Sequence, residues 1–248
     1  VGGFAVSGRT VSKGIIEDIL LSTPDSTRIY VSDTIAKGNV GGFAVSGRSA
    51  GKSGSGRFLD LTATNYFIGH ESGQNITTGV YNSTLGFNSG YLLSSGNYNS
   101  FIGYQSGFKT EGGSGNLFLG YQTGFDNSSG NYNSFLGYQA GYNNTSGSGN
   151  SFMGSYSGFA NTAGNTNTFV GFSSGTNNTL GNGNTFIGSY VGYSNTEGFY
   201  NVYIGERAGY SGTGADLNVF IGYRSGYQVS DGTKNIAMGY LSGYGLTS

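Results

Sequence analysis

The sequence has no cysteine, no tryptophan, one proline and one histidine, and only 9% of its residues are charged, against about 25% in an average soluble domain. The lack of cysteine excludes disulfide bridges and thiolate metal sites. Eleven basic and twelve acidic residues give a net charge of -1 and no basic stripe for a nucleic acid. No apolar run reaches the roughly 18 residues that indicate a membrane span, and no signal peptide is visible. Nucleic-acid binding and membrane insertion are therefore excluded for this stretch of chain.

Glycine and aromatic residues are abundant instead, with 49 glycines in 248 residues and 15% aromatic content. Disordered chains are poor in aromatic residues, so the low charge does not indicate disorder here. The sequence begins at Val1 rather than at methionine and stops part-way through a repeat. We therefore expect it to be a piece of a longer polypeptide that has apolar surface to bury.

A 17-residue repeat runs through residues 65–248 in eleven copies, without insertion or deletion. Each copy opens with asparagine, which we number position 1, and positions 5 and 9 are always glycine. Position 3 is Phe or Tyr in nine copies, position 4 is always Ile, Leu, Val or Met, and position 13 is Ser or Thr in all but one copy. Phe101-Ile102-Gly103 and Phe220-Ile221-Gly222 are two examples of the motif at positions 3 to 5. Such a fixed period is the signature of a repeat architecture.

A unit of this length is too short for two helices, and its frequent glycines disfavour any helix. The period predicts an all-β fold, a parallel β-solenoid or β-roll of stacked 17-residue coils, each with two or three short strands. At a strand spacing of about 4.8 Å, the eleven coils form a rod of roughly 50 Å. We expect glycine at positions 5 and 9 where φ is positive or where a side chain would collide with the next coil. The position-1 asparagines are expected to stack as an amide ladder, and a solvated turn is the alternative.

Adjacent residues on a strand point to opposite faces. Position 3 is mostly aromatic and position 4 is aliphatic, so one of the two lines the interior and the other forms a second apolar surface along the rod. A stripe of this size exceeds what soluble monomers normally expose, which predicts a partner rod.

The stretch 1–64 carries a different repeat, because the segment 1–9 recurs unchanged as the segment 40–48. We therefore divide the chain into a 39-residue-repeat β region at 1–64 and the solenoid at 65–248. Residues 4–6 and 28–31 are predicted strands, Pro24 and Asp25 a turn, and the Ile-rich residues 15–21 a strand rather than a helix.

The repeat unit resembles the head repeats of trimeric autotransporter adhesins of the YadA type. Residues 133–141, Asn-Ser-Phe-Leu-Gly-Tyr-Gln-Ala-Gly, place a small polar residue, two apolar residues and a glycine ahead of a small-residue–glycine corner, as those repeats do. The resemblance covers residues 65–248, and the 39-residue units resemble repeats of large surface or tail-fibre-like proteins of Bacteroidota. It implies a left-handed parallel β-roll wound as a homotrimer of coaxial rods, with adhesion as its role. The 17-residue period is longer than a head repeat, and Phe and Tyr replace the Ala and Val common there.

Three features are candidate sites. Residues 47–53, Gly-Arg-Ser-Ala-Gly-Lys-Ser, fall one residue short of a phosphate-binding P-loop. The equivalent segment of the other 39-residue unit, residues 8–14, does not keep the motif, so we interpret residues 47–53 as a corner of the repeat. Residues 212–216 contain a single aspartate, whereas calcium-binding β-roll repeats need one in every coil. His70 occupies a position that is Tyr in five other copies, so it is interpreted as a surface or column substitute rather than a ligand or base. We predict no catalytic, cofactor-binding or metal site, and no enzymatic activity.

Three functions remain open at this point. The first is a structural or adhesive extracellular fibre at a bacterial cell surface, whose partner is itself and whose further ligand is a host, glycan or surface component. The second is a receptor- or glycan-binding tail fibre of a phage-like particle. The third is an ice-binding solenoid, but the Thr-rich column at position 13 has no matching row two residues before it. The sequence does not name a ligand.

Overall fold

The computed structural model describes residues 20–23, 26–29, 43–44 and 59–246, the first three ranges as strands only. Tertiary contacts divide the chain into two compact units, Val1–Gly42 and Phe43–Ser248. In the first unit, β1 (Leu20–Thr23) and β2 (Ser26–Ile29) pair antiparallel. These strands include part of the predicted strands at 15–21 and 28–31. The predicted strand at 4–6 and the turn at Pro24 and Asp25 lie outside the described residues.

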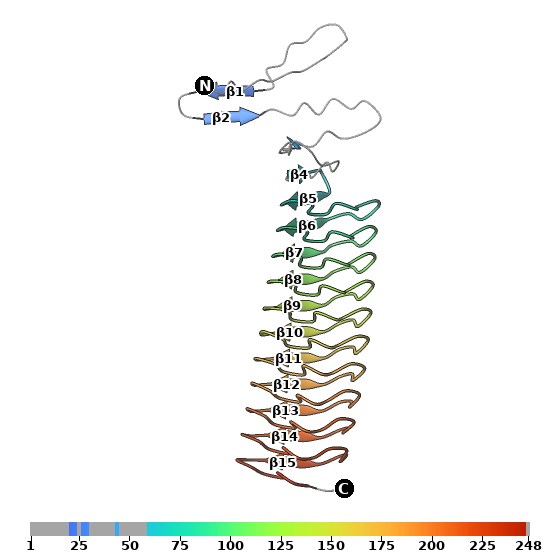
Figure 1. Cartoon of the computed structure of the whole chain (residues 1–248), viewed down its shortest axis with the longest axis vertical. Helices are drawn as coiled ribbons and strands as arrows, with labels where there is room; N and C mark the ends of the chain where they lie inside the picture. The colour runs from blue at the N-terminus through green and yellow to red at the C-terminus, as the bar shows by residue number, and fades with distance from the viewer. Residues whose placement is uncertain (1–19, 24–25, 30–42, 45–58, 247–248) are drawn as a thin grey trace, which may run out of the picture. The chain divides into compact units, whose positions relative to one another are not determined.

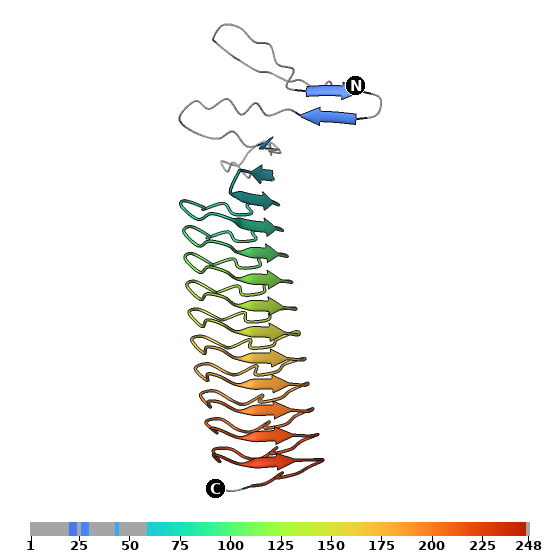
Figure 2. The same cartoon turned by 180° about the vertical axis from the view of Figure 1, so that it is seen from behind.

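The second unit contains one sheet of 13 strands, β3 to β15, in chain order. Figures 1 and 2 show β5 to β15 one above another, with their arrows pointing the same way. The strands are β3 (Phe43–Ala44), β4 (Leu59–Leu61), β5 (Asn65–Ile68), β6 (Asn82–Leu85), β7 (Ser100–Ile102), β8 (Leu117–Leu119), β9 (Ser134–Leu136), β10 (Ser151–Met153), β11 (Thr168–Val170), β12 (Thr185–Ile187), β13 (Val202–Ile204), β14 (Val219–Ile221) and β15 (Ile236–Met238).

The register of the sheet follows the sequence repeat. Each strand from β5 to β15 pairs parallel with the next, and Phe135 lies opposite Phe152, its equivalent in the following coil. The described residues contain no helix, so the predicted all-β parallel solenoid with 17-residue coils is confirmed. At the N-terminal end, β4 pairs antiparallel with both β5 and β3, and the parallel stacking stops there. The change of repeat at residue 65 therefore falls within the second unit.

The expectation of two or three strands per coil was wrong, because each coil has one strand. Position 5, position 7 and position 9 all adopt positive φ, as at Gly137, Gln139 and Gly141, and so does Tyr132 at position 17. Such residues interrupt an extended backbone, so only the short stretch up to position 4 remains a strand. The rest of each coil is turns that still bond to the next coil, as where the Gly141 N–H donates to the Ser157 carbonyl at 2.9 Å.

Position-3 side chains fill the interior of the coils. From Phe101 to Phe220 their rings stack in an unbroken column, with centroids 4.7–5.0 Å apart. All these rings are buried, and the small side chains of Thr84 and Ala237 take the same place towards the two ends. Tyr203 is the only tyrosine in this column, and burial raises the pKa of its phenol. The strand therefore has an inner apolar face at position 3 and an outer one at position 4.

Glycine at position 9 is required by this packing. Gly141 has a φ of 58°, and a Cβ there would overlap the ring of Phe135 in the same coil. Position 9 thus combines the two reasons expected from the sequence, a left-handed backbone and a close approach.

Candidate functional site

The position-1 asparagines form a ladder that joins all eleven coils and is buried in every coil but the last. At Asn150, Oδ1 accepts a hydrogen bond from the backbone N–H of Asn167 at 2.9 Å, and Nδ2 donates to the carbonyl of Gly164 at 2.8 Å. Equivalent bonds recur in the other coils, with N–H to Oδ1 distances of 2.9–3.0 Å. The predicted amide ladder is therefore confirmed, and the alternative, a solvated turn, is not what the structure shows. Its bonds run mainly to the backbone, so each amide links one coil to the next and closes the corner of its own coil.

A second amide ladder, which was not predicted from the sequence, lies at position 12. Asn127, Asn144, Asn161, Asn178 and Asn195 are buried. Each Nδ2 from Asn144 onward donates to the preceding Oδ1 at 2.6–2.8 Å. Five consecutive asparagines at one repeat position were the signal that could have revealed it.

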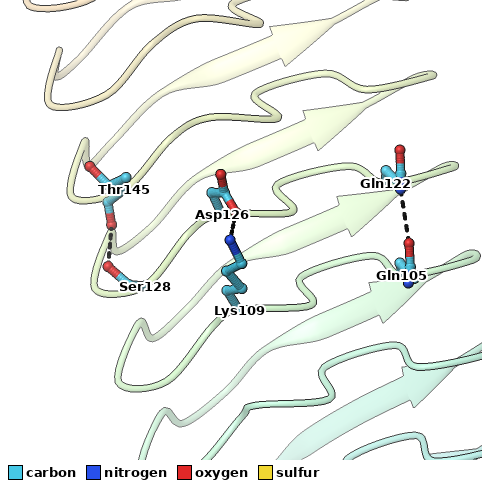
Figure 3. Close-up of polar contacts among 6 residues, drawn as sticks. All are labelled: Gln105, Lys109, Gln122, Asp126, Ser128 and Thr145. Carbon is cyan, nitrogen blue, oxygen red and sulfur yellow. Dashed lines mark hydrogen bonds and ion pairs between the residues drawn. The ribbon is translucent and has the colours of Figure 1, made fainter.

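Polar side chains outside the core also bond along the rod, as Figure 3 shows. At position 13, the Ser128 hydroxyl donates to the Thr145 carbonyl at 3.1 Å. At position 7, Nε2 of Gln122 donates to Oε1 of Gln105 at 2.8 Å. At position 11, the ammonium group of Lys109 lies 2.7 Å from the carboxylate of Asp126, which raises the pKa of the lysine. The position-13 hydroxyls that gave a Thr-rich column therefore serve coil stacking.

Two of the three candidate features lie among the described residues, and each has a local structural role. His70 stacks on Phe87 with ring centroids 5.5 Å apart, and its Nε2 lies 3.5 Å from Glu71, so it is the first ring of an outer column at position 6. Asp216 uses Oδ1 to accept the N–H of Phe199 at 2.7 Å. Residues 47–53 lie outside the described residues. Within the described ranges, no group of three His, Cys, Asp or Glu residues is placed to hold a metal ion.

The outer surface of the coils repeats as regularly as the interior. We call the exposed aliphatic side chains at position 4 the position-4 column. Its members in the central coils, Leu119, Leu136 and Met153, are 40–46% exposed. Aromatic side chains form further outer columns at positions 6 and 10, and position 17 adds four exposed tyrosines, Tyr81, Tyr98, Tyr132 and Tyr200. Few charges interrupt these columns, so the candidate functional site is an extended, nearly uncharged surface rather than a pocket.

Most rings of the outer columns at positions 6 and 10 stack on the ring of the next coil. At position 10, Tyr193, Tyr210, Tyr227 and Tyr244 have centroids 5.0–5.2 Å apart and planes within 8° of parallel. Burial and the neighbouring phenols raise the pKa of Tyr210. Because each ring covers the faces of its neighbours, these columns present mostly ring edges and hydroxyls to solvent.

Comparison of the chain with protein-family models, curated proteins and solved structures gave no match. The described residues contain no long apolar helix that could serve as a bilayer span.

Proposed function

We propose that the chain is a passive extracellular fibre segment, structural or adhesive, that catalyses no reaction. One observation carries this proposal: the residues that recur in every coil use their hydrogen-bonding groups to join coil to coil, as Asn150 does with Asn167 and Gly164. On the outer surface, an aliphatic side chain recurs at position 4 of every coil and an aromatic one at position 10 of nine of the eleven coils. Weak contacts repeated along such a surface gain strength from valency rather than from one binding pocket.

We also propose that the rods assemble as a homotrimer around one axis. The support is the position-4 column, because an aliphatic surface that recurs with every coil matches a partner that has the same axial spacing, and a second copy has it. Burying the exposed part of each side chain contributes on the order of 1 kcal/mol, so a whole column contributes roughly 10 kcal/mol. The number three, the coaxial arrangement and left-handed winding rest on the resemblance to trimeric autotransporter adhesins.

Assembly is tested by placing charge on the position-4 column. We expect the wild-type chain to sediment at three times its 25.7 kDa mass, and the double variant Leu119→Lys/Leu136→Lys to sediment as a single chain. Both side chains point outward from the strand, so the coil interior is untouched, but a buried ammonium group adds a desolvation penalty of several kcal/mol. Sedimentation equilibrium and circular dichroism measure mass and fold.

Two controls accompany this experiment. Ser146→Lys adds one lysine at an exposed corner, half the charge that the double variant adds, and His70→Ala removes the only histidine. Both are expected to leave the assembled mass unchanged. A wild-type chain that sediments as a folded monomer would refute the partner rod.

Imaging of the native source tests the function itself. Gold-labelled antibodies against residues 65–248 are expected to decorate filaments at the cell surface in electron micrographs. Label on the fibres of a phage-like injection particle would instead support the alternative, a receptor- or glycan-binding tail fibre. Label confined to the cell interior would contradict both proposals.

A further inference from the structure

Seven pairs of tyrosines stack between adjacent coils. Their ring centroids are 5.0–5.5 Å apart, and their planes lie within 16° of parallel. The pairs are Tyr81–Tyr98, Tyr104–Tyr121, Tyr121–Tyr138, Tyr193–Tyr210, Tyr210–Tyr227, Tyr223–Tyr240 and Tyr227–Tyr244. In every pair the two residues are one repeat apart, because the sheet register places like positions opposite each other.

We propose that these pairs are sites of oxidative cross-linking, at which a dityrosine bond joins one coil to the next. Such a modification is separate from adhesion, and it would supply covalent staples to a chain that has no cysteine. The oxidant is a haem-peroxidase-type catalyst that uses hydrogen peroxide. Each phenol loses one electron and one proton, and the two phenoxyl radicals form a bond between their ortho carbons. Each ring then regains its aromaticity when its ortho hydrogen moves to oxygen, and the peroxide takes up the two electrons and two protons to become two waters.

The geometry favours coupling within the rod. A tyrosyl radical at Tyr210 has a second phenol about one strand spacing away on each side, at Tyr193 and at Tyr227. Reacting groups held side by side behave as if they were at very high concentration, so coupling to the fixed neighbour outruns coupling between molecules. Bond formation requires the two rings to turn about χ2, a broad torsion for tyrosine, so that their ortho carbons face each other, and the two side chains to move closer together.

Two exposed tyrosines that do not stack allow the effects of proximity and of exposure on cross-linking to be separated. Tyr132 and Tyr200, at position 17, are 74% and 64% exposed, but no ring among residues 59–246 stacks on either. Gly115 and Gly149 occupy the places beside Tyr132 in its column. If accessibility to the oxidant decides the products, these two tyrosines react as readily as Tyr98 and Tyr240, which are 66% and 74% exposed and do stack. If stacking decides, Tyr132 and Tyr200 stay unlinked.

The experiment oxidises the full chain at low concentration with peroxidase and hydrogen peroxide, and maps cross-linked peptides by mass spectrometry. We expect dityrosine peptides dominated by partners one repeat apart, with the position-10 run from Tyr193 to Tyr244 among them. The same treatment in denaturant is expected to lose this preference. Products dominated by Tyr132 or Tyr200, or the same distribution with and without denaturant, would overturn the proposal.

Matched variants make the test specific. Tyr210→Phe keeps a ring in the column, as Phe108 and Phe125 do in other coils, but leaves one of the three tyrosine pairs in the position-10 run. We expect dityrosine from that run to fall about threefold, with circular dichroism unchanged. Tyr132→Phe removes a phenol that is more exposed but unstacked, and it is expected to leave the dityrosine yield unchanged. A loss of yield from Tyr132→Phe that equals the loss from Tyr210→Phe would contradict the role of stacking.

Discussion

Gly137→Val is expected to destabilise the solenoid by about 3 kcal/mol or more. Gly137 has a φ of 137°, a conformation that a β-branched residue rarely adopts. A Cβ at this place would lie 2.7 Å from both the carbonyl carbon and the carbonyl oxygen of Gly154 in the next coil. Those are backbone atoms held by the hydrogen bonds of two coils, so they cannot move aside as the end of a flexible side chain could.

Repeat proteins lose stability mainly at the interface between neighbouring units, so the damage should be local. Hydrogen exchange followed by mass spectrometry is expected to show faster exchange in residues 133–166, and urea unfolding a lower midpoint. Gly214→Ala is the matched control, because a Cβ there meets no atom within 4 Å and its φ is not positive. Equal exchange profiles for the two variants would mean that position 5 is not constrained by the next coil.

Position 15 shows how the repeat tolerates an exception. Glycine there avoids a collision with the position-15 carbonyl of the next coil and also with position 12 of its own coil, as Gly181 does with Gly198 and with the amide of Asn178. In the ninth coil Ala215 takes this position, and its partner at position 12 is Gly212. A Cβ added to Gly212 would lie only 3.4 Å from Cβ of Ala215, so the methyl group occupies the space that the missing side chain leaves. The side chains at positions 12 and 15 therefore share the same space in the corner of the coil.

The unbroken period was enough to predict the parallel register and the position-1 ladder, because stacking of identical coils forces like residues into columns. It was not enough to predict the course of the chain between strands. Gln139 and Tyr132 adopt positive φ without being glycine, so no residue type marked these bends. The sequence also showed that positions 3 and 4 face opposite ways without showing which is inside. That choice depends on which ring fits over glycine at position 9, as Phe135 does over Gly141, and this contact exists only once the coil closes.

The candidate surface, like the fold, could be predicted from the sequence only in part. The exposed columns could be derived from the pattern once the inner face was known, and the nearly uncharged character could be read from composition alone. The ring stacking at position 10 could not be predicted from the pattern, because parallel planes at 5.0–5.2 Å are known only from the three-dimensional arrangement of successive coils. Aromatic residues that recur once in every repeat therefore predict contact between rings but not the way in which their planes face.

Asn150→Asp is expected to make the stability of the solenoid strongly dependent on pH. The side chain of Asn150 is fully buried, and its Nδ2 donates to the carbonyl of Gly164. An ionised aspartate cannot donate this bond and would place a negative oxygen against a carbonyl oxygen. It would still accept the N–H of Asn167, but no cation lies in the ladder to neutralise it. We expect a loss of about 3–5 kcal/mol at pH 7.

The sign of the pH effect follows from the protonated form. A neutral aspartic acid can donate its O–H to the Gly164 carbonyl as the amide does, so the folded chain holds the proton more tightly than the unfolded chain, and the folded pKa rises above the usual value of about 3.9. Stability is then greatest below about pH 4 and falls as pH rises through the raised pKa. Urea unfolding measured between pH 3 and 8 should show this decline for Asn150→Asp but not for the wild type.

Asn182→Asp is the control, because it makes the same substitution at position 16. There the side-chain oxygen of Asn182 accepts the N–H of Asn165 at 2.6 Å, and the natural Asp216 makes the same kind of bond to Phe199 in a later coil. The variant loses only the bond from Nδ2 to the carbonyl of Leu180, so we expect a loss of about 1 kcal/mol and little change with pH. If both variants lost stability in parallel as pH rose, the effect would come from added charge on the rod. A decline confined to Asn150→Asp would instead show that the buried amide must act as donor and acceptor together, the property that only asparagine supplies at position 1.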